Sequence, residues 1–251
     1  MTFIKSTCLG LVVLLNACSS NNVADKQNIV SKQAIIAAPM SGDPWQHKAQ
    51  TIKALPNRYL NQASVIPEAV NRRFEQGLLL IRQNKLSEAQ SVYLSLAEQY
   101  PRLSGSWLQL AHIQASFITQ ATDAQTKQQS LDKQIAYLNN AIQANPDNYH
   151  AHNQLARVLR EQGRFSRALY HYDLALSAWP AFPEARLNRA ILHDLYLGNK
   201  KAARDDYQLY QALVAEPNRQ VKGWIIDIER QLQIQEQLYN ASSGSIKGES
   251  Q

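Results

Sequence analysis

Helical segments recur along this chain with a period of about 34 residues, which leaves few folds open to it. Pro101, Pro146 and Pro180 each close a stretch of helix-forming residues, and the last two prolines lie one full period apart. Pro217 closes a fourth stretch less regularly. Such a period is typical of stacked helical hairpins, each of which buries its apolar face only against its neighbours. The repeat therefore predicts an all-α fold.

The clearest unit runs from Tyr149 to Phe182 and places each residue type where a helical hairpin needs it. Small residues let two helices approach closely, a turn glycine supplies a positive backbone dihedral, and a proline ends the second helix. The same template fits residues 70–103 without a gap and residues 183–217 with a looser end. The unit's small residues are Ala156, Ala168 and Ala175, its turn glycine is Gly163, and its large positions are Leu155, Leu159, Phe165, Tyr172 and Leu176.

This pattern resembles the tetratricopeptide repeat (TPR). The resemblance implies a right-handed α-solenoid of antiparallel helix hairpins that binds other proteins. The predicted domain spans residues 65–239, with repeats at about 70–103, 104–148, 149–182 and 183–217. The second repeat carries about eleven residues more than a regular unit, around Phe117–Ser130. Two interpretations are open: a degenerate repeat with an extended hairpin, or sequence drift that only lengthens two helices.

A helix at residues 219–238 is predicted to cover the last repeat. Val221, Trp224, Ile225, Ile228 and Leu232 recur at helical spacing and form one apolar face. A solenoid needs such a terminal element because its last hydrophobic surface otherwise faces water. Residues 240–251 are rich in Ser, Gly and Lys, which predicts a disordered tail.

Residues 1–17 are predicted to be a secretory signal peptide. Lys5 is followed by a short apolar run and then by Ala17, and the run is too short to span a bilayer. The sequence Leu15-Asn16-Ala17-Cys18 resembles the bacterial lipobox, which implies lipid attachment at Cys18 and a palmitate-bearing anchor. Ser19, next in the chain, implies by the same resemblance the inner leaflet of the outer membrane, facing the periplasm. The alternative is an ordinary signal peptide with a chance cysteine.

Residues 18–64 show no sustained helical period and are predicted to be a lipidated, flexible tether. If flexible, about 46 residues span roughly 35–40 Å end to end, which lifts a domain clear of the lipid headgroups. A short helix between Trp45 and Leu55, with Trp45 docked on the domain or on lipid, is the alternative for part of this segment.

The sequence offers no residues for catalysis, a cofactor or a metal. The two cysteines are Cys8 and Cys18, both near the start of the chain, and the six histidines follow no known metal-ligand spacing. No Gly-rich phosphate loop or nucleophile elbow occurs. Arg204-Asp205-Asp206 and Tyr196-Leu197-Gly198 fall at ordinary second-helix and turn positions. The chain is therefore predicted not to be an enzyme.

The TPR resemblance assigns a peptide-binding groove to the first helix of each hairpin. One end of the predicted groove is apolar and the other is polar and cationic. Arginines hold carboxylates through forked hydrogen bonds, which favours an acidic ligand, and the alternative is that these side chains are only solvated. The groove residues are Phe74, Leu78, His112, His150, Asn153, Arg157, Arg160 and Asn188.

Two functions are compatible with an anchor, a tether and a binding solenoid. The first is a scaffold or assembly factor for a protein complex of the bacterial cell envelope. The second is a module that binds a peptide or cell-wall ligand and delivers it to an envelope enzyme. The net charge of +6 favours acidic partners or anionic surfaces. Nucleic acid is excluded by the predicted export and by the lack of an aromatic and basic strip on which bases would stack.

Overall fold

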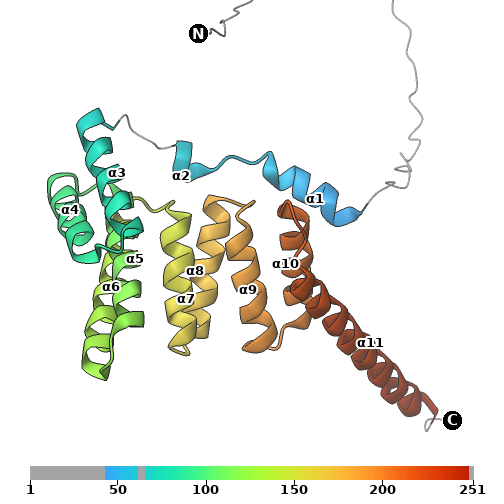
Figure 1. Cartoon of the computed structure of the whole chain (residues 1–251). Helices are drawn as coiled ribbons and strands as arrows, with labels where there is room; N and C mark the ends of the chain where they lie inside the picture. Colours follow the sequence, from blue (N-terminus) through green and yellow to red (C-terminus); the bar gives the residue numbers. More distant parts are fainter. Residues whose placement is uncertain (1–42, 62–65, 249–251) are drawn as a thin grey trace, which may run out of the picture. The chain divides into compact units, whose positions relative to one another are not determined.

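A computed structural model describes residues 43–61 and 66–248, and every regular element in these ranges is a helix (Figure 1). The predicted signal peptide, Cys18 and the first part of the predicted tether lie outside the described residues. The helices are α1 (Pro44–Lys53), α2 (Arg58–Asn61), α3 (Glu68–Arg82), α4 (Leu86–Gln99), α5 (Ser104–Gln120), α6 (Ala124–Ala144), α7 (Tyr149–Glu161), α8 (Phe165–Ala178), α9 (Pro183–Leu195), α10 (Lys200–Leu213) and α11 (Arg219–Gly248).

From α3 onward the helices pack as consecutive hairpins. The pairs are α3 with α4, α5 with α6, α7 with α8, and α9 with α10, and each pair packs on the next. The turns between paired helices contain residues with positive φ: Asn84 (59°), Gly163 (73°) and Gly198 (65°). The repeat pattern predicted turns at Gly163 and Gly198, and the prediction of an all-α hairpin stack is confirmed.

Each second helix buries a tyrosine or small residues against the neighbouring helices. Tyr93, Tyr172 and Tyr207 are almost fully buried on α4, α8 and α10. Alanines such as Ala156 and Ala168 are 0% exposed, so the backbones of α7 and α8 lie close together. The small residues of the repeat thus allow close approach of the paired helices, as the repeat pattern predicted, and the large ones fill the space between them.

The extra residues of the second repeat lengthen its helices. Helix α5 has 17 residues and α6 has 21, whereas α4, α8 and α10 have 14 each. The turn between α5 and α6 is short, and the Asp123 side chain caps α6 by accepting a hydrogen bond from the Thr126 N–H at 2.8 Å. The extra residues therefore lengthen both helices of the second repeat and form no long loop between them.

Residues 43–61 fold onto the solenoid, which corrects the prediction of a tether reaching residue 64. We call these residues the strap. Helix α1 packs on α10, with Ala49 fully buried and Trp45 and Ile52 half-buried in the same cluster. Asp43 caps α1 by accepting a hydrogen bond from the Trp45 N–H at 2.9 Å. The alternative of a short docked helix is therefore what the structure shows for this segment.

The second half of the strap contacts the other hairpins. Arg58 pairs with Asp147 at 2.6 Å. The Tyr59 ring meets Tyr149 edge-on at 5.8 Å, and its hydroxyl lies 3.3 Å from the Ser104 hydroxyl. The chain thus enters the solenoid beside α10 and runs back to α5 and α7 before α3 begins (Figure 1).

Replacing Ala49 by aspartate should release α1 from α10. The site is closed by Leu209, Ala212 and Leu213, which offer no partner to a carboxylate. We expect α1 to undock and the free energy of unfolding to fall by about 2 kcal/mol. Hydrogen exchange at the α1 amides measures the release, and Gln50→Asp, at an exposed neighbouring position, is the matched control. Unchanged protection of α1 in the Ala49→Asp variant would show that the strap is held by other contacts.

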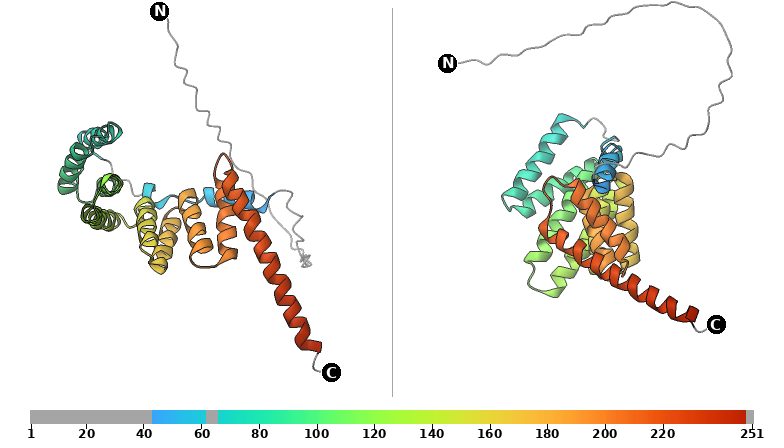
Figure 2. Two further views of the ribbon diagram at one scale, coloured as in Figure 1. Left: turned by 60° about the horizontal axis from the view of Figure 1, so that its bottom comes forward. Right: turned by 90° about the vertical axis from the view of Figure 1, so that its right-hand side faces the viewer.

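Helix α11 covers the last hairpin through the predicted face. Val221 and Ile228 are buried against Ala190, Ala203 and Tyr207. The helix continues to Gly248, so the segment predicted to be a disordered tail is helical up to that residue. Its second half projects past α9 and α10 (Figure 2). Among the described residues, no helix is long and apolar enough to cross a membrane.

Candidate functional site

The first helices of the hairpins position the side chains that were predicted to form a groove. Phe74 and Leu78 lie on α3, His112 on α5, and Asn188 on α9. The other four lie on α7, where His150 and Arg157 are exposed, Asn153 is buried and Arg160 is half-buried. Helix α7 therefore carries most of the polar groups of the site.

The structure brings Asn153 and Asn188 into direct contact. The Asn188 Nδ2 donates a hydrogen bond to the Asn153 Oδ1 at 3.1 Å. This bond links α7 to α9, and it uses the Asn153 oxygen and one Asn188 donor. Each amide retains further hydrogen-bonding capacity. The pair therefore ties α7 to α9 at this point of the array.

His112, His150 and Arg157 share one electrostatic environment between α5 and α7. Burial lowers the pKa of His112, and the neighbouring His150 and Arg157 lower it further. His112 is therefore neutral at pH 7, and its Nε2 is a buried atom without a hydrogen-bond partner among the described residues. The positive charge of this region comes from the arginines.

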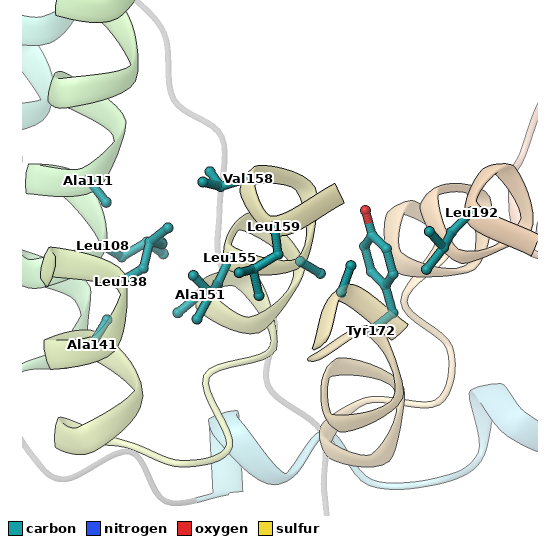
Figure 3. Packing of buried hydrophobic residues seen from close by; sticks show 12 residues of the cluster. Leu108, Ala111, Leu138, Ala141, Ala151, Leu155, Val158, Leu159, Tyr172 and Leu192 are labelled. Carbon is teal, nitrogen blue, oxygen red and sulfur yellow. The ribbon is translucent and has the colours of Figure 1, made fainter. Parts of the chain in front are cut away.

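Arg160 and Tyr172 bring two further unpartnered polar atoms to the same region. The Arg160 Nη1 and the Tyr172 hydroxyl are buried and form no hydrogen bond with the described residues. Burial raises the pKa of Tyr172 to about 12, and the charges of Arg160 and Arg157 partly offset this rise. Figure 3 shows the Tyr172 hydroxyl directed between α7 and α9. A buried polar atom without a partner costs about 1–3 kcal/mol, which a ligand or water would recover.

The repeat pattern assigned Tyr172 only a packing role, and the structure confirms its burial while leaving its hydroxyl without a partner among the described residues. Tyr93 and Tyr207 hold similar positions, yet their hydroxyls donate to the Phe74 carbonyl at 3.0 Å and to the Asp194 Oδ2 at 3.4 Å. Only a three-dimensional arrangement distinguishes the Tyr172 hydroxyl from these two.

Phe74 lies at the other end of the repeat array, apart from the polar cluster. The centroid of its ring lies 5.2 Å from that of the Tyr93 ring. Phe74 also lines a cavity of about 290 Å³, together with Tyr59 of the strap. Leu78 is half-buried on the same helix. The apolar and polar halves of the predicted groove therefore form two separate regions. Among the described residues, no three metal-ligating side chains gather.

Comparison with known structures connects this arrangement to a recognised fold. A thermophilic TPR protein of Thermus thermophilus matches with a TM-score of 0.54 and 18% identity, over 73% of this chain and 90% of that one. The pilF protein of Pseudomonas aeruginosa matches with a TM-score of 0.53 and 17% identity, over 69% and 74%. Residues 137–170 also match the family model described as tetratricopeptide repeat. The fold is a TPR solenoid.

The matched TPR segment covers the end of α6, all of α7 and part of α8, and so contains four of the eight predicted groove residues. A double mutant of the protein MamA RS-1 has the same fold, with a TM-score of 0.52 and 12% identity over 74% of this chain and 100% of that one. Comparison of the sequence with curated proteins finds no match. TPR solenoids as a class present extended concave surfaces to their binding partners.

Proposed function

We propose that this protein is a membrane-anchored TPR scaffold that holds partner proteins during the assembly or work of a complex of the bacterial cell envelope. The observation that carries the proposal is the pair of arginines on α7: Arg157 is exposed, Arg160 is half-buried, and neither forms an ion pair with the described residues. A TPR solenoid that carries such cations is suited to binding a partner protein through charged hydrogen bonds.

Anchoring at Cys18 is part of the proposal and is supported by the sequence Leu15-Asn16-Ala17-Cys18. Several acyl chains, at about 0.8 kcal/mol per buried methylene, make such attachment effectively permanent. Labelling cells with a palmitate analogue tests this step. Label on the wild-type chain and none on a Cys18→Ala variant is the expected result, and equal labelling of both would overturn the anchor.

The scaffold role is tested by crosslinking intact cells and purifying the chain from solubilised membranes. We expect a defined envelope protein to be recovered with the wild-type chain and to be depleted when Arg157 and Arg160 are both replaced by alanine. Recovery of no envelope protein under conditions that capture a known membrane complex would contradict the proposed function.

A second candidate function is favoured by the charge of the same cluster: binding of an acidic peptide or cell-wall ligand for delivery to an envelope enzyme. Arg157 and Arg160 form no ion pair with the described residues. Two guanidinium groups without an ion-pair partner among these residues favour a carboxylate ligand.

Replacing both Arg157 and Arg160 by alanine should weaken binding of a short peptide with two C-terminal glutamates at least tenfold. Each lost hydrogen bond to a charged group is worth about 1.5–3 kcal/mol, so tenfold is a lower bound. Calorimetry measures the affinity. The matched control is the pair Arg164→Ala and Arg167→Ala, which removes two exposed cations near the next turn. An equal loss in both double variants would indicate only non-specific attraction to positive charge.

A further inference from the structure

Helix α11 encloses a cavity with α9 and α10 that differs in chemistry from the cluster on α7. We propose that this cavity binds the cationic side chain of a lysine or arginine on an extended segment of the partner protein. The inference rests on the proposed scaffold function and adds a requirement to it: the partner carries a basic residue beside its acidic group.

The cavity has a volume of about 350 Å³. This lies at the lower end of the range for sites that hold small molecules, and is ample for one long side chain. Apolar and polar residues of α9, α10 and α11 line it together. The walls are Ile191, Leu195, Tyr207, Trp224 and Ile228, and the polar residues are Asp194, Lys200, Asp227 and Gln231.

The walls suit the methylene groups of a long basic side chain. Lysine and arginine bury their apolar stems while their charged ends remain at a polar rim. Trp224 is half-buried, and its ring lies 5.4 Å from the Tyr207 ring. A cation placed over an indole face gains about 0.5–2 kcal/mol, and tryptophan is the best aromatic residue for this contact.

One carboxylate of the cavity is already satisfied. The Lys200 Nζ lies 2.7 Å from the Asp194 Oδ1, and the Tyr207 hydroxyl donates to the Asp194 Oδ2 at 3.4 Å. Asp194 and Lys200 therefore neutralise each other, and the remaining charge of the lining depends on Asp227.

Asp227 gives the lining of the cavity a negative charge that its one ion-pair partner among the described residues compensates only weakly. Its side chain is 62% exposed, and Arg230 approaches it only to 3.9 Å with a side chain that is itself 68% exposed. Gln231 donates to the Asp227 Oδ2 at 2.9 Å, which orients the carboxylate without neutralising it. Among the lining residues there are two carboxylates and one ammonium group. A cationic ligand is therefore attracted and an anionic one repelled.

The cavity adjoins the cationic cluster on α7. The charge of Arg160 acts on the Tyr207 hydroxyl, and Tyr207 lines the cavity. Arg160 and Asp194 lie one repeat period apart, at matching places on α7 and α9. The Tyr172 hydroxyl near Arg160 has no partner among the described residues, whereas the Tyr207 hydroxyl near Asp194 is used. Arg160 thus carries a positive charge on α7, and Asp227 carries the negative charge of the cavity on α11. The partner segment therefore binds with its acidic group over α7 and its basic side chain toward α11.

The test uses the chain from Ser19 to Gln251, which contains every described residue, and the blocked pentapeptide Ala-Ala-Arg-Ala-Ala. The readout is the indole N–H resonance of Trp224, assigned through its loss in a Trp224→Phe variant. We expect a saturable shift with peptide up to about 10 mM, a range suited to a single side chain. The same peptide with neutral citrulline in place of arginine should bind at least fivefold more weakly.

Asp227→Asn should weaken binding of the arginine peptide at least fivefold. The fold should remain intact because Asp227 is exposed. Asp132→Asn, at an exposed position on α6, is the matched control and should change nothing. Equal binding of the citrulline peptide, an unaffected Asp227→Asn variant or no saturable shift of Trp224 would each overturn the inference.

A further variant separates this inference from the scaffold proposal. Asp227→Lys reverses the charge at the cavity and should reduce capture of the crosslinked envelope partner. Undiminished capture would overturn the basic-residue requirement and leave the scaffold function standing. If the wild-type chain itself captured no envelope partner, the scaffold function would be overturned instead.

Discussion

Replacing Asp206 by alanine is expected to lower the free energy of unfolding by about 3–5 kcal/mol. The change leaves the buried Arg186 without a counter-charge among the described residues and leaves Arg189 with Asp173 alone. Asp206 is only 5% exposed and binds two arginines of α9. Its Oδ2 accepts from the Arg189 Nε at 2.7 Å, and its Oδ1 accepts from the Arg186 Nη1 at 3.2 Å. These bonds join α9 to α10.

Urea unfolding followed by circular dichroism measures the loss. The control is Asp205→Ala, which removes a neighbouring carboxylate that is 46% exposed and pairs only with Arg204 among the described residues. Exposed pairs contribute about 0–1 kcal/mol, so this variant should remain close to wild type. Similar destabilisation by the two substitutions would show that the buried position of Asp206 is not what matters.

Gly77→Val is expected to destabilise the domain by roughly 3 kcal/mol, the upper end of the range for an overpacked core. A Cβ atom at Gly77 would lie 2.5 Å from the Tyr93 Cζ and 2.8 Å from its hydroxyl. Tyr93 cannot move aside easily because it is fully buried and its hydroxyl donates to the Phe74 carbonyl. The glycine is therefore required for α3 and α4 to approach each other.

Gly223→Val is the matched control, since a Cβ at Gly223 has nothing within 4 Å. Valine is favoured over glycine within a helix by a few tenths of a kcal/mol, so this variant should be unchanged or slightly more stable. Combining Gly77→Val with Tyr93→Leu should cost less than the sum of the two single changes, because both act at one contact. Strict additivity of the two would contradict a clash between these residues.

The candidate site could be predicted from the sequence only in part. The repeat register placed Asn153, Arg157, Arg160 and Asn188 on first helices, where the structure has them. It carried no sign that Asn188 donates to Asn153, or that the Tyr172 hydroxyl lacks a partner among the described residues. Both facts depend on which side chains of different helices meet, and sequence spacing is silent on this.

The strap shows the same limit in the fold. Helix α1 has ten residues, and its contact with α10 is made by Trp45, Ala49 and Ile52. Three apolar residues in so short a segment produce a weak periodic signal, and an isolated helix of this length is marginal in water. Its stability comes from α10, which lies in the last of the four hairpins and is therefore distant from α1 along the chain.

The hairpins, their turns and the covering face of α11 follow from the sequence alone, because each depends on residues that are close in the chain. Prolines, turn glycines and the 3.6-residue helical period act locally, and the repetition of the unit multiplies their signal. The docking of the strap, the unpartnered hydroxyl of Tyr172 and the cavity that α11 closes over α9 and α10 are properties of the folded domain. They arise between distant segments, where packing and charge pairing select among contacts that the local pattern permits equally.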